Sequence, residues 1–436
     1  MQNQQETQYL KILNSKPYLE YQHGDVLTGI DLFSKIILTS PNDSNIWVEL
    51  GNAHLKNIDF QMAKMCFDTA LKLNPYNPNA LCAVGLYFFE SGLFEKAKDY
   101  FIKTLDISPN SEWALLNLSL AEQKLGNHKN GLKLYEKREK DRSLLLHENL
   151  DLRNLRELLF INESHINKKI LIIGEQGFGD QLMACLYIKK LSSMGLDITY
   201  LVHEKLYDLL INVNDLKGIR IVNKFTQKES NLYDFKIFSM SLPFLFKQNK
   251  LKKSYVIIRK DKIKNNVKNI ELLKNLSSKN KLNVGIAWSG RPTQTRNSFR
   301  SLNIELLNTI VSDEEINFFS LQKSTSKSEK NFFMKYGNFF NCEDYLNNFQ
   351  DTSFFVSKMD VIISVCTSLV HLSGLIRKKT LLLLSYVHDP RWDNEEECLY
   401  PNLQIITQKQ LNNWEYCLTE AREYLNNLKY NRRKKC

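Results

Sequence analysis

A repeat with a period of about 34 residues constrains the fold of the first third of the chain more than any other feature. The first clear unit runs from Ser44 to Asn77 and carries Trp47, Leu50, Gly51, Ala63, Phe67, Ala70 and Pro75. One period later the chain has Leu81, Val84, Gly85, Ala97, Phe101 and Pro109, with Gly92 at the expected turn and Thr104 as the one departure. Apolar residues at this spacing, with small residues where two helices would touch, predict a stack of helical hairpins.

Two degenerate units flank this pair. A further step forward gives Leu115, Leu118, Ser119, Gly126, Gly131 and Tyr135, and a step back gives Gly24, Gly29, Phe33 and Pro41. The spacing resembles the tetratricopeptide repeat, in which terminal units are often atypical because they cap the stack. Stacked hairpins leave a concave groove. We therefore expect the array to bind a protein partner or to orient the rest of the chain, and a purely structural cap is the alternative.

Composition and charge are those of a packed protein with several domains. The chain has 436 residues, of which 43% are hydrophobic, with 16 Gly and 9 Pro. The formal charge of +11 favours anionic partners, although the Lys residues are dispersed and only the tail from Arg432 to Lys435 is dense. Nucleic acid is not an expected partner, because no motif interleaves aromatic and basic residues.

The eight cysteines form no Cys-x-x-Cys pair and no Cys/His cluster at metal-ligand spacing, which predicts reduced thiols and no metal site. The N-terminus lacks an apolar signal core, and no apolar run approaches the ~18 residues that a membrane span needs. We expect a cytoplasmic protein, with peripheral contact to the inner membrane as an alternative.

A change of pattern after Lys169 predicts the first of two α/β domains. A buried strand over Ile170–Ile173 leads into Gly174-Glu-Gln-Gly-Phe-Gly-Asp180 and then into a helix over Gln181–Met194. Glycine lets the backbone approach a ligand, and a helix N-terminus attracts an anion. The glycine order is not the dinucleotide fingerprint, so a nicotinamide cofactor has weak support. Further strands are predicted at Asp197–Val202, Ile219–Val222 and Phe235–Ser239.

The pattern restarts at Asn283–Trp288, a strand that leads into Ser289-Gly-Arg-Pro292. Short apolar runs then predict strands at Phe318–Leu321, Val361–Val365 and Leu381–Leu384, and a last helix over Gln408–Tyr430. The segment Cys366–Gly374 is predicted to place hydroxyl and N–H groups at the carboxyl end of a strand, where open α/β sheets bind ligands. The predicted boundaries are 1–145 for the repeats, 146–166 for a helical linker, 167–278 for the first α/β domain and 279–436 for the second.

Several stretches of the second half carry a family resemblance, and they occur in the order expected of that family. They are Val284–Gly290, Arg300-Ser301, Ser320–Lys323, Asp351-Thr352, Met359–Ser364, Thr367-Ser368 with His371-Leu372 and Gly374, Arg391-Trp392 and Tyr400-Pro401. They resemble bacterial tetratricopeptide proteins that carry a glycosyltransferase module similar to the heptosyltransferases of glycosyltransferase family nine. The resemblance implies a GT-B architecture, in which two Rossmann-like domains face a cleft. It further implies an acceptor on the first domain, a nucleotide-sugar donor on the second, inversion at the anomeric carbon, and neither metal nor cofactor.

The resemblance also implies roles for individual residues. Asp180 matches the Gly-Asp end of the family's glycine turn and is the candidate general base, with helix capping as the alternative, and Gly177 and Gly179 belong to the acceptor-side loop. The implied donor-binding residues are Gly290, Arg296, Arg300, Gln322, Lys323, Thr367, Ser368, His371, Gly374 and Trp392. Of these, the three cations could instead be surface residues, His371 a core imidazole, and Trp392 either a stacking platform for the base or a residue that closes the domain.

One position departs from the family pattern. Cys366 stands where these proteins usually carry Asp before Thr-Ser, and a thiol cannot accept hydrogen bonds as a carboxylate does. Either the donor sugar differs or activity is reduced; a nucleophilic Cys366 is disfavoured because no His/Asp partner is evident. The predicted function is therefore an inverting glycosyltransferase acting on a glycan or protein, and the alternative is a tetratricopeptide scaffold with a degenerate module. Residues outside the motifs decide the donor sugar, nucleotide base, acceptor and oligomeric state.

Overall fold

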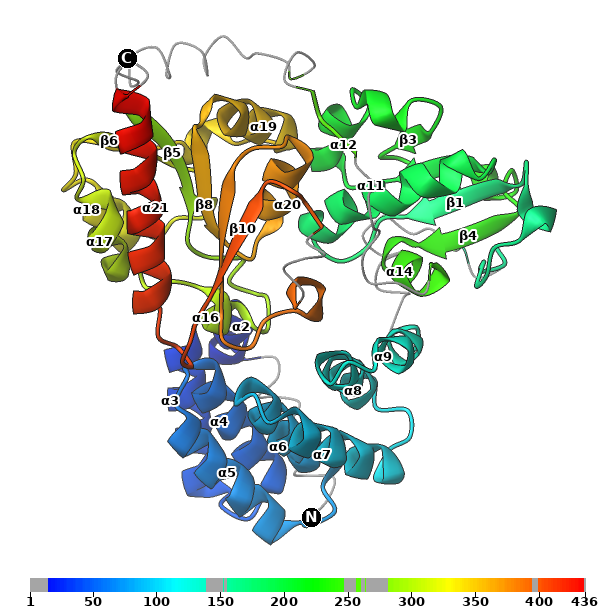
Figure 1. The fold of residues 1–436 in the computed structure, drawn as a ribbon. Helices are drawn as coiled ribbons and strands as arrows, with labels where there is room; N and C mark the ends of the chain where they lie inside the picture. Colours follow the sequence, from blue (N-terminus) through cyan, green and yellow to red (C-terminus); the bar gives the residue numbers. More distant parts are fainter. Residues whose placement is uncertain are drawn as a thin grey trace.

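The computed structural model describes residues 15–138, 152, 155–246, 256–259, 263, 281–393 and 399–434. Figure 1 shows a helical array, coloured blue to cyan, beneath two α/β domains. Residues 1–14, Lys435, Cys398 and Cys436 lie outside the described residues, as does most of the segment between Lys247 and Lys281. The other six cysteines are free thiols. None of the described helices is long and apolar enough to cross a membrane.

The first domain is the predicted stack of helical hairpins. Its helices are α2 (Lys16–Gln22), α3 (Val26–Thr39), α4 (Ser44–Lys56), α5 (Phe60–Leu73), α6 (Pro78–Glu90), α7 (Phe94–Ile107), α8 (Glu112–Lys124) and α9 (His128–Tyr135). The repeat glycines let paired helices touch: a Cβ atom on Gly85 would lie 2.5 Å from Cε1 of Phe101, and one on Gly51 would lie 2.4 Å from Cε1 of Phe67. Close packing of these pairs explains why a glycine recurs at the same place in successive repeats.

A four-stranded parallel sheet in the order β3-β2-β1-β4 forms the centre of the second domain. Its elements are β1 (Lys169–Ile173), α11 (Phe178–Ser193), β2 (Asp197–Leu201), α12 (Glu204–Leu210), β3 (Arg220–Val222), α13 (Gln227–Ser230), β4 (Phe235–Phe238) and α14 (Leu242–Leu245). Strand β1 is buried from Ile170 onward, as parallel strands covered on both faces should be. The four predicted strands are confirmed, and the helix after β1 begins at Phe178 rather than Gln181.

A six-stranded parallel sheet in the order β10-β9-β8-β5-β6-β7 forms the third domain. Its elements are β5 (Leu282–Ala287), α16 (Asn297–Arg300), α17 (Asn308–Val311), β6 (Ile316–Ser320), α18 (Lys327–Phe333), β7 (Phe339–Asn341), α19 (Phe349–Lys358), β8 (Val361–Val365), α20 (Ser368–Leu375), β9 (Thr380–Leu384), β10 (Leu403–Thr407) and α21 (Glu415–Arg433). Counted from β5, this is the doubly wound order 3-2-1-4-5-6. The predicted class, a helical repeat array followed by two Rossmann-like domains, is confirmed.

Three local predictions need correction. The last helix begins at Glu415, because Gln408–Trp414 forms strand-end and turn structure in which Asn412 has a φ of 56°. Strands β7 and β10 were not predicted. Residues 155–162 of the expected helical linker are not helical, and Glu157 instead forms a parallel bridge to Lys236.

The two Rossmann-like domains touch through their helices, since α11 packs on α20 and α12 on α19 (Figure 1). Phe178 at the start of α11 lies with its ring 5.1 Å from the ring of Phe349 in α19. This contact brings the glycine turn after β1 close to the turn after β8.

Candidate functional site

Arg300 lies at the switch point of the six-stranded sheet, where the carboxyl ends of β5 and β8 diverge. Its Nη1 donates a hydrogen bond of 3.1 Å to the carbonyl oxygen of Cys366. A Cβ atom on Gly290 would lie 2.2 Å from Arg300 Nη2, so only glycine leaves room for this guanidinium. Arg300 Nε and Asn297 Oδ1 are both buried and have no hydrogen-bond partner among the described residues. The crevice therefore holds a cation with unused donor capacity.

The turn after β8 adds the N-terminus of α20 to this crevice. Thr367 is the N-cap residue, and its Oγ1 accepts a hydrogen bond of 3.3 Å from the backbone N–H of Leu369. Ser368 is the first helical residue and is partly exposed. The backbone N–H groups of this first turn and the positive end of the helix dipole favour an anion beside Arg300.

Asp180 lies in the first turn of α11 and makes two polar contacts. Its Oδ2 accepts a hydrogen bond of 3.0 Å from the backbone N–H of Gly177, so the side chain does cap its helix. Its Oδ1 accepts a hydrogen bond of 2.8 Å from Nη1 of Arg391, in the other Rossmann-like domain. The Asp180 carboxylate therefore caps its own helix and also forms an ion pair with the other domain.

Arg391 is the functional candidate that the sequence-based assignment missed. Its Nε lies 3.0 Å from Oδ1 of Asp389 while its Nη1 binds Asp180. Burial alone would raise the pKa of the Asp389 carboxyl, but the charge and hydrogen bonds of Arg391 outweigh burial and lower the pKa to about 2. The available signal was its position, next to Trp392 in a polar loop that follows a strand.

His371 is enclosed between the two domains. It is 3% exposed, and its Nδ1 lies 3.0 Å from the hydroxyl of Tyr400. Burial, and then the charge of Arg391, lower the pKa of His371 to about 3, so the imidazole is neutral at physiological pH. A Cβ atom on Gly179 would lie 2.8 Å from Cδ2 of His371, which makes Gly179 the contact point between α11 and α20.

The buried Trp392 and the partly exposed Cys366 form a pair beside these residues. The indole of Trp392 is 2% exposed and donates from Nε1 to Sγ of Cys366 at 3.3 Å. Burial raises the pKa of the Cys366 thiol, so the group is protonated rather than nucleophilic near neutral pH. The ring of Trp392 lies 5.4 Å from that of His371, and Gly374 packs against the ring of Tyr400.

Three other predicted donor-binding residues are engaged by groups of the protein itself. Gln322 accepts a hydrogen bond of 3.2 Å from the backbone N–H of Ser289, and Lys323 donates from Nζ to the carbonyl oxygen of Glu343 at 2.7 Å. Arg296 points toward the repeat array, where its Nε donates to Glu90 Oε1 at 2.6 Å. The structure thus groups Gly290, Arg300, Thr367 and Ser368 at one crevice and Asp180, Arg391 and His371 at the adjoining domain contact.

The corresponding crevice of the four-stranded sheet is occupied by the repeat array. Arg138, which follows α9, donates from Nε to Oε2 of Glu175 at 3.1 Å and from Nη2 to Ser241 Oγ at 3.0 Å. Glu175 follows β1 and Ser241 follows β4, so the guanidinium lies at the switch point between the two strands. Within the described ranges, no group of three or more His, Cys, Asp and Glu side chains is placed to hold a metal ion.

Comparison with known protein families identifies the repeat. Residues 44–77 match the family model of the tetratricopeptide repeat. Anaphase-promoting complex subunit 3 of Schizosaccharomyces pombe is 22% identical over 158 residues, which are 36% of this chain and 23% of that protein. The chain therefore spans less than a quarter of the length of this curated relative.

Two solved structures are also similar to part of the chain. The E. coli ADP-heptose lps heptosyltransferase II is 12% identical with a TM-score of 0.42, covering 59% of this chain and 99% of that one. A glycosyl transferase family 9 protein from Veillonella parvula is 8% identical with a TM-score of 0.45, covering 61% and 99%. The chain thus combines a tetratricopeptide repeat, continued by similar helical hairpins on both sides, with two parallel Rossmann-like domains.

Proposed function

We propose that this chain is an inverting glycosyltransferase that moves a sugar from a nucleotide-sugar donor to a glycan or protein acceptor without a metal ion. The observation that carries the proposal is the 2.8 Å contact between Asp180 of one Rossmann-like domain and Arg391 of the other, directly beside the Arg300 crevice. A carboxylate that can accept a proton and two cations that can bind a diphosphate meet there. These are the groups that metal-independent sugar transfer needs.

Asp180 is the proposed general base. An acceptor hydroxyl attacks the anomeric carbon on the face opposite the nucleotide and gives its proton to the Asp180 carboxylate as the new C–O bond forms. The bond from the anomeric carbon to the phosphate oxygen breaks, and the nucleoside diphosphate leaves with the electron pair. A positioned base contributes about 10²–10⁴-fold to such a step.

The second domain stabilises the leaving group in this proposal. Arg300 supplies a guanidinium whose Nε has no partner in the described structure, and α20 directs the N–H groups that follow Thr367 into the same crevice. Arg391 would exchange its bond to Asp180 for one to the diphosphate when the donor binds. That exchange frees the carboxylate to act as a base, so donor binding precedes proton transfer.

The repeat array is proposed to recruit or orient the acceptor or a protein partner. Stacked helical hairpins expose a concave surface suited to an extended chain. The array also contacts both Rossmann-like domains. Arg138, which follows α9, binds Glu175 of the first, and Glu90 of α6 binds Arg296 of the second.

Release of nucleoside diphosphate from a panel of sugar nucleotides tests the proposal, with EDTA present and with water, glycans or peptides as acceptors. Release by the wild-type chain that falls at least a hundredfold in Asp180→Asn supports it. Asp197→Asn, an exposed carboxylate at the start of β2, is the matched control.

The scaffold alternative is favoured by the neutral Cys366 and by the engagement of Asp180 with Arg391. It predicts that nucleotides bind while no sugar nucleotide is turned over with any acceptor. A wild-type chain that behaves in this way would replace the enzyme proposal by the scaffold one.

A further inference from the structure

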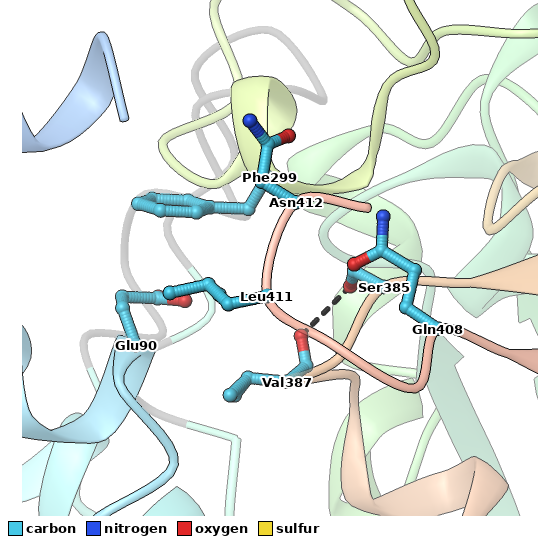
Figure 2. Close-up of a pocket in the computed structure, with 7 residues that line it drawn as sticks. All are labelled: Glu90, Phe299, Ser385, Val387, Gln408, Leu411 and Asn412. Carbon is cyan, nitrogen blue, oxygen red and sulfur yellow. Dashed lines mark hydrogen bonds between the residues drawn. The ribbon is translucent and has the colours of Figure 1, made fainter. Parts of the chain in front are cut away.

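Two loops of the second Rossmann-like domain border the candidate donor crevice, and both lie against the repeat array. The first, residues 289–300, ends in Arg300, and the second, residues 385–393, contains Arg391. Figure 2 shows side chains from both domains lining a narrow space between them, with Glu90 from α6 facing Phe299 and Val387. The array therefore forms one wall beside the loops that carry the candidate donor-binding cations.

A single carboxylate of the array connects the two loops. Glu90, at the end of α6, has a side chain that is 1% exposed. It accepts hydrogen bonds from Arg296 Nε at 2.6 Å and from Nη2 at 2.9 Å. The same Nη2 donates to the carbonyl oxygen of Val387 at 3.0 Å, so Arg296 joins one loop to the other while Glu90 holds it.

The electrostatics of the pair favour a permanent contact. Burial lowers the pKa of the Arg296 guanidinium, but the Glu90 carboxylate, together with Asp389 and Cys366, outweighs burial, so the pKa stands above its ordinary value. A paired and buried Arg–carboxylate fork has a defined geometry, because two parallel hydrogen bonds fix both planes. Arg296 is consequently directed away from Arg300 and toward the array.

Apolar contacts hold the same loops on either side of this pair. Phe299, adjacent to Arg300, is 8% exposed and lies with its ring 6.1 Å from that of Phe60 at the start of α5. Val387 packs into the repeat cluster formed by Phe89, Ala97, Phe101, Leu118 and Ala121. A Cβ atom on Gly92 would lie 3.0 Å from Tyr386, and Lys124 of α8 pairs with Asp393.

These contacts follow the repeat period. Positive φ angles mark the turns inside the hairpins at Gly24, Ile58, Gly92 and Gly126, each one repeat period from the next. Gly24 approaches Pro292, the turn at Ile58 precedes Phe60, and Gly92 approaches Tyr386. One edge of the array is therefore a continuous docking edge for the loops around the crevice.

We infer that Glu90 is a positioning residue for the nucleotide site: by holding Arg296 and, through it, Val387, it sets the places of Arg300 and Arg391. The inference rests on the proposed function, since it concerns the same donor site. It gives the repeat array a role in donor binding that differs from acceptor recruitment. A partner that shifts α6 would change nucleotide affinity.

Calorimetric titration of the full chain tests the inference, with whichever of UDP, GDP, ADP and CDP binds wild type most tightly as the probe. Glu90→Ala and Arg296→Ala should each weaken binding on the order of tenfold. The charge-swapped double variant, Glu90→Arg with Arg296→Glu, should recover most of that loss, because it restores the pair and leaves a donor for the Val387 carbonyl oxygen. Glu95→Ala, an exposed carboxylate in the first turn of α7, is the matched control and should bind as wild type does.

Each other outcome decides against the inference. Unchanged affinity in a folded Glu90→Ala chain would overturn it, as would a charge swap that recovers nothing, which would make Arg296 itself a nucleotide contact. If Glu90→Ala does not fold, Glu90→Gln replaces it as the test variant. Amide hydrogen exchange in residues 290–300 and 386–393 of that variant should be faster than in wild type. Exchange as slow as in wild type would overturn the inference. Absence of nucleotide binding by wild type would overturn the proposed function and this inference together, whereas the preceding outcomes leave the proposed function intact.

Discussion

Asp180 and Arg391 join the two Rossmann-like domains by an ion pair of 2.8 Å, although 211 residues separate them in the chain. Asp180→Asn keeps an oxygen for the Gly177 N–H but removes the base, so turnover should fall about 10²–10⁴-fold while nucleotide affinity does not fall. Steady-state release of nucleoside diphosphate measures this, with Asp197→Asn as the control. Full turnover by a folded Asp180→Asn chain would reduce Asp180 to a helix cap.

Gly85 is predicted to be intolerant of a methyl group. Its Cβ would lie 2.5 Å from the buried Phe101 ring, and overpacking of this kind costs about 1–3 kcal/mol. Gly85→Ala should lower the free energy of unfolding by this amount in urea denaturation, even though alanine is the better helix former. Gly337→Ala, where nothing lies within 4 Å, is the control. Equal stability of the two variants would contradict the close packing of α6 on α7.

Arg138 should contribute to stability because its removal leaves Glu175 buried, with a side chain only 1% exposed. Breaking one partner of a buried ion pair costs about 3–5 kcal/mol. Arg138→Ala should therefore lower the free energy of unfolding by that order. Arg220→Ala is the comparison, because its pair with Glu229 is exposed and should contribute about 1 kcal/mol or less. Similar losses in both variants would argue against the docking of Arg138 at the switch point.

His371 should make stability depend on pH. Its folded pKa of about 3 lies below the unfolded value near 6.5, so between these values the unfolded chain binds a proton that the folded chain does not. The contribution of the neutral His371 to the free energy of unfolding is therefore complete above pH 6.5. As the pH falls from there toward the folded pKa, this contribution declines by about 1.4 kcal/mol per pH unit. Urea denaturation between pH 6 and pH 4.5 should show a smaller pH slope for His371→Gln than for wild type. The exposed His23→Gln variant should keep the wild-type slope; identical slopes in all three would contradict the buried neutral imidazole.

The repeat and the sheets were predictable because their signals are local. Gly51 and Gly85 recur at one period, and the inner strands β1, β5 and β8 are mostly apolar and mostly buried, as expected of parallel strands covered on both faces. Strand β10 escaped prediction because it lies at a sheet edge, where only Ile406 is fully buried. Strand β7 is three residues long and lies at the opposite edge.

The partners within the site were not predictable from local patterns. Arg296 was assigned to the donor as a cation implied by the family resemblance, but its carboxylate partner, Glu90, lies 206 residues earlier in another domain. Asp180 and Arg391 were each visible as polar residues after a strand, yet only the contact of α11 with α20 makes them a pair. Burial of Trp392 likewise depends on domain packing that no single segment encodes.

Calorimetric titration of the purified chain with UDP, GDP, ADP and CDP in the presence of EDTA tests the central claim most directly, because it needs no acceptor. The account predicts saturable binding of at least one nucleotide and, in Arg300→Ala, affinity weakened by about 10–100-fold through loss of charge-assisted hydrogen bonds. Arg291→Ala, an exposed cation in the same loop, should bind as wild type does. No binding of any of the four nucleotides, or equal binding by Arg300→Ala and wild type, would contradict a nucleotide-sugar site at the β5–β8 crevice.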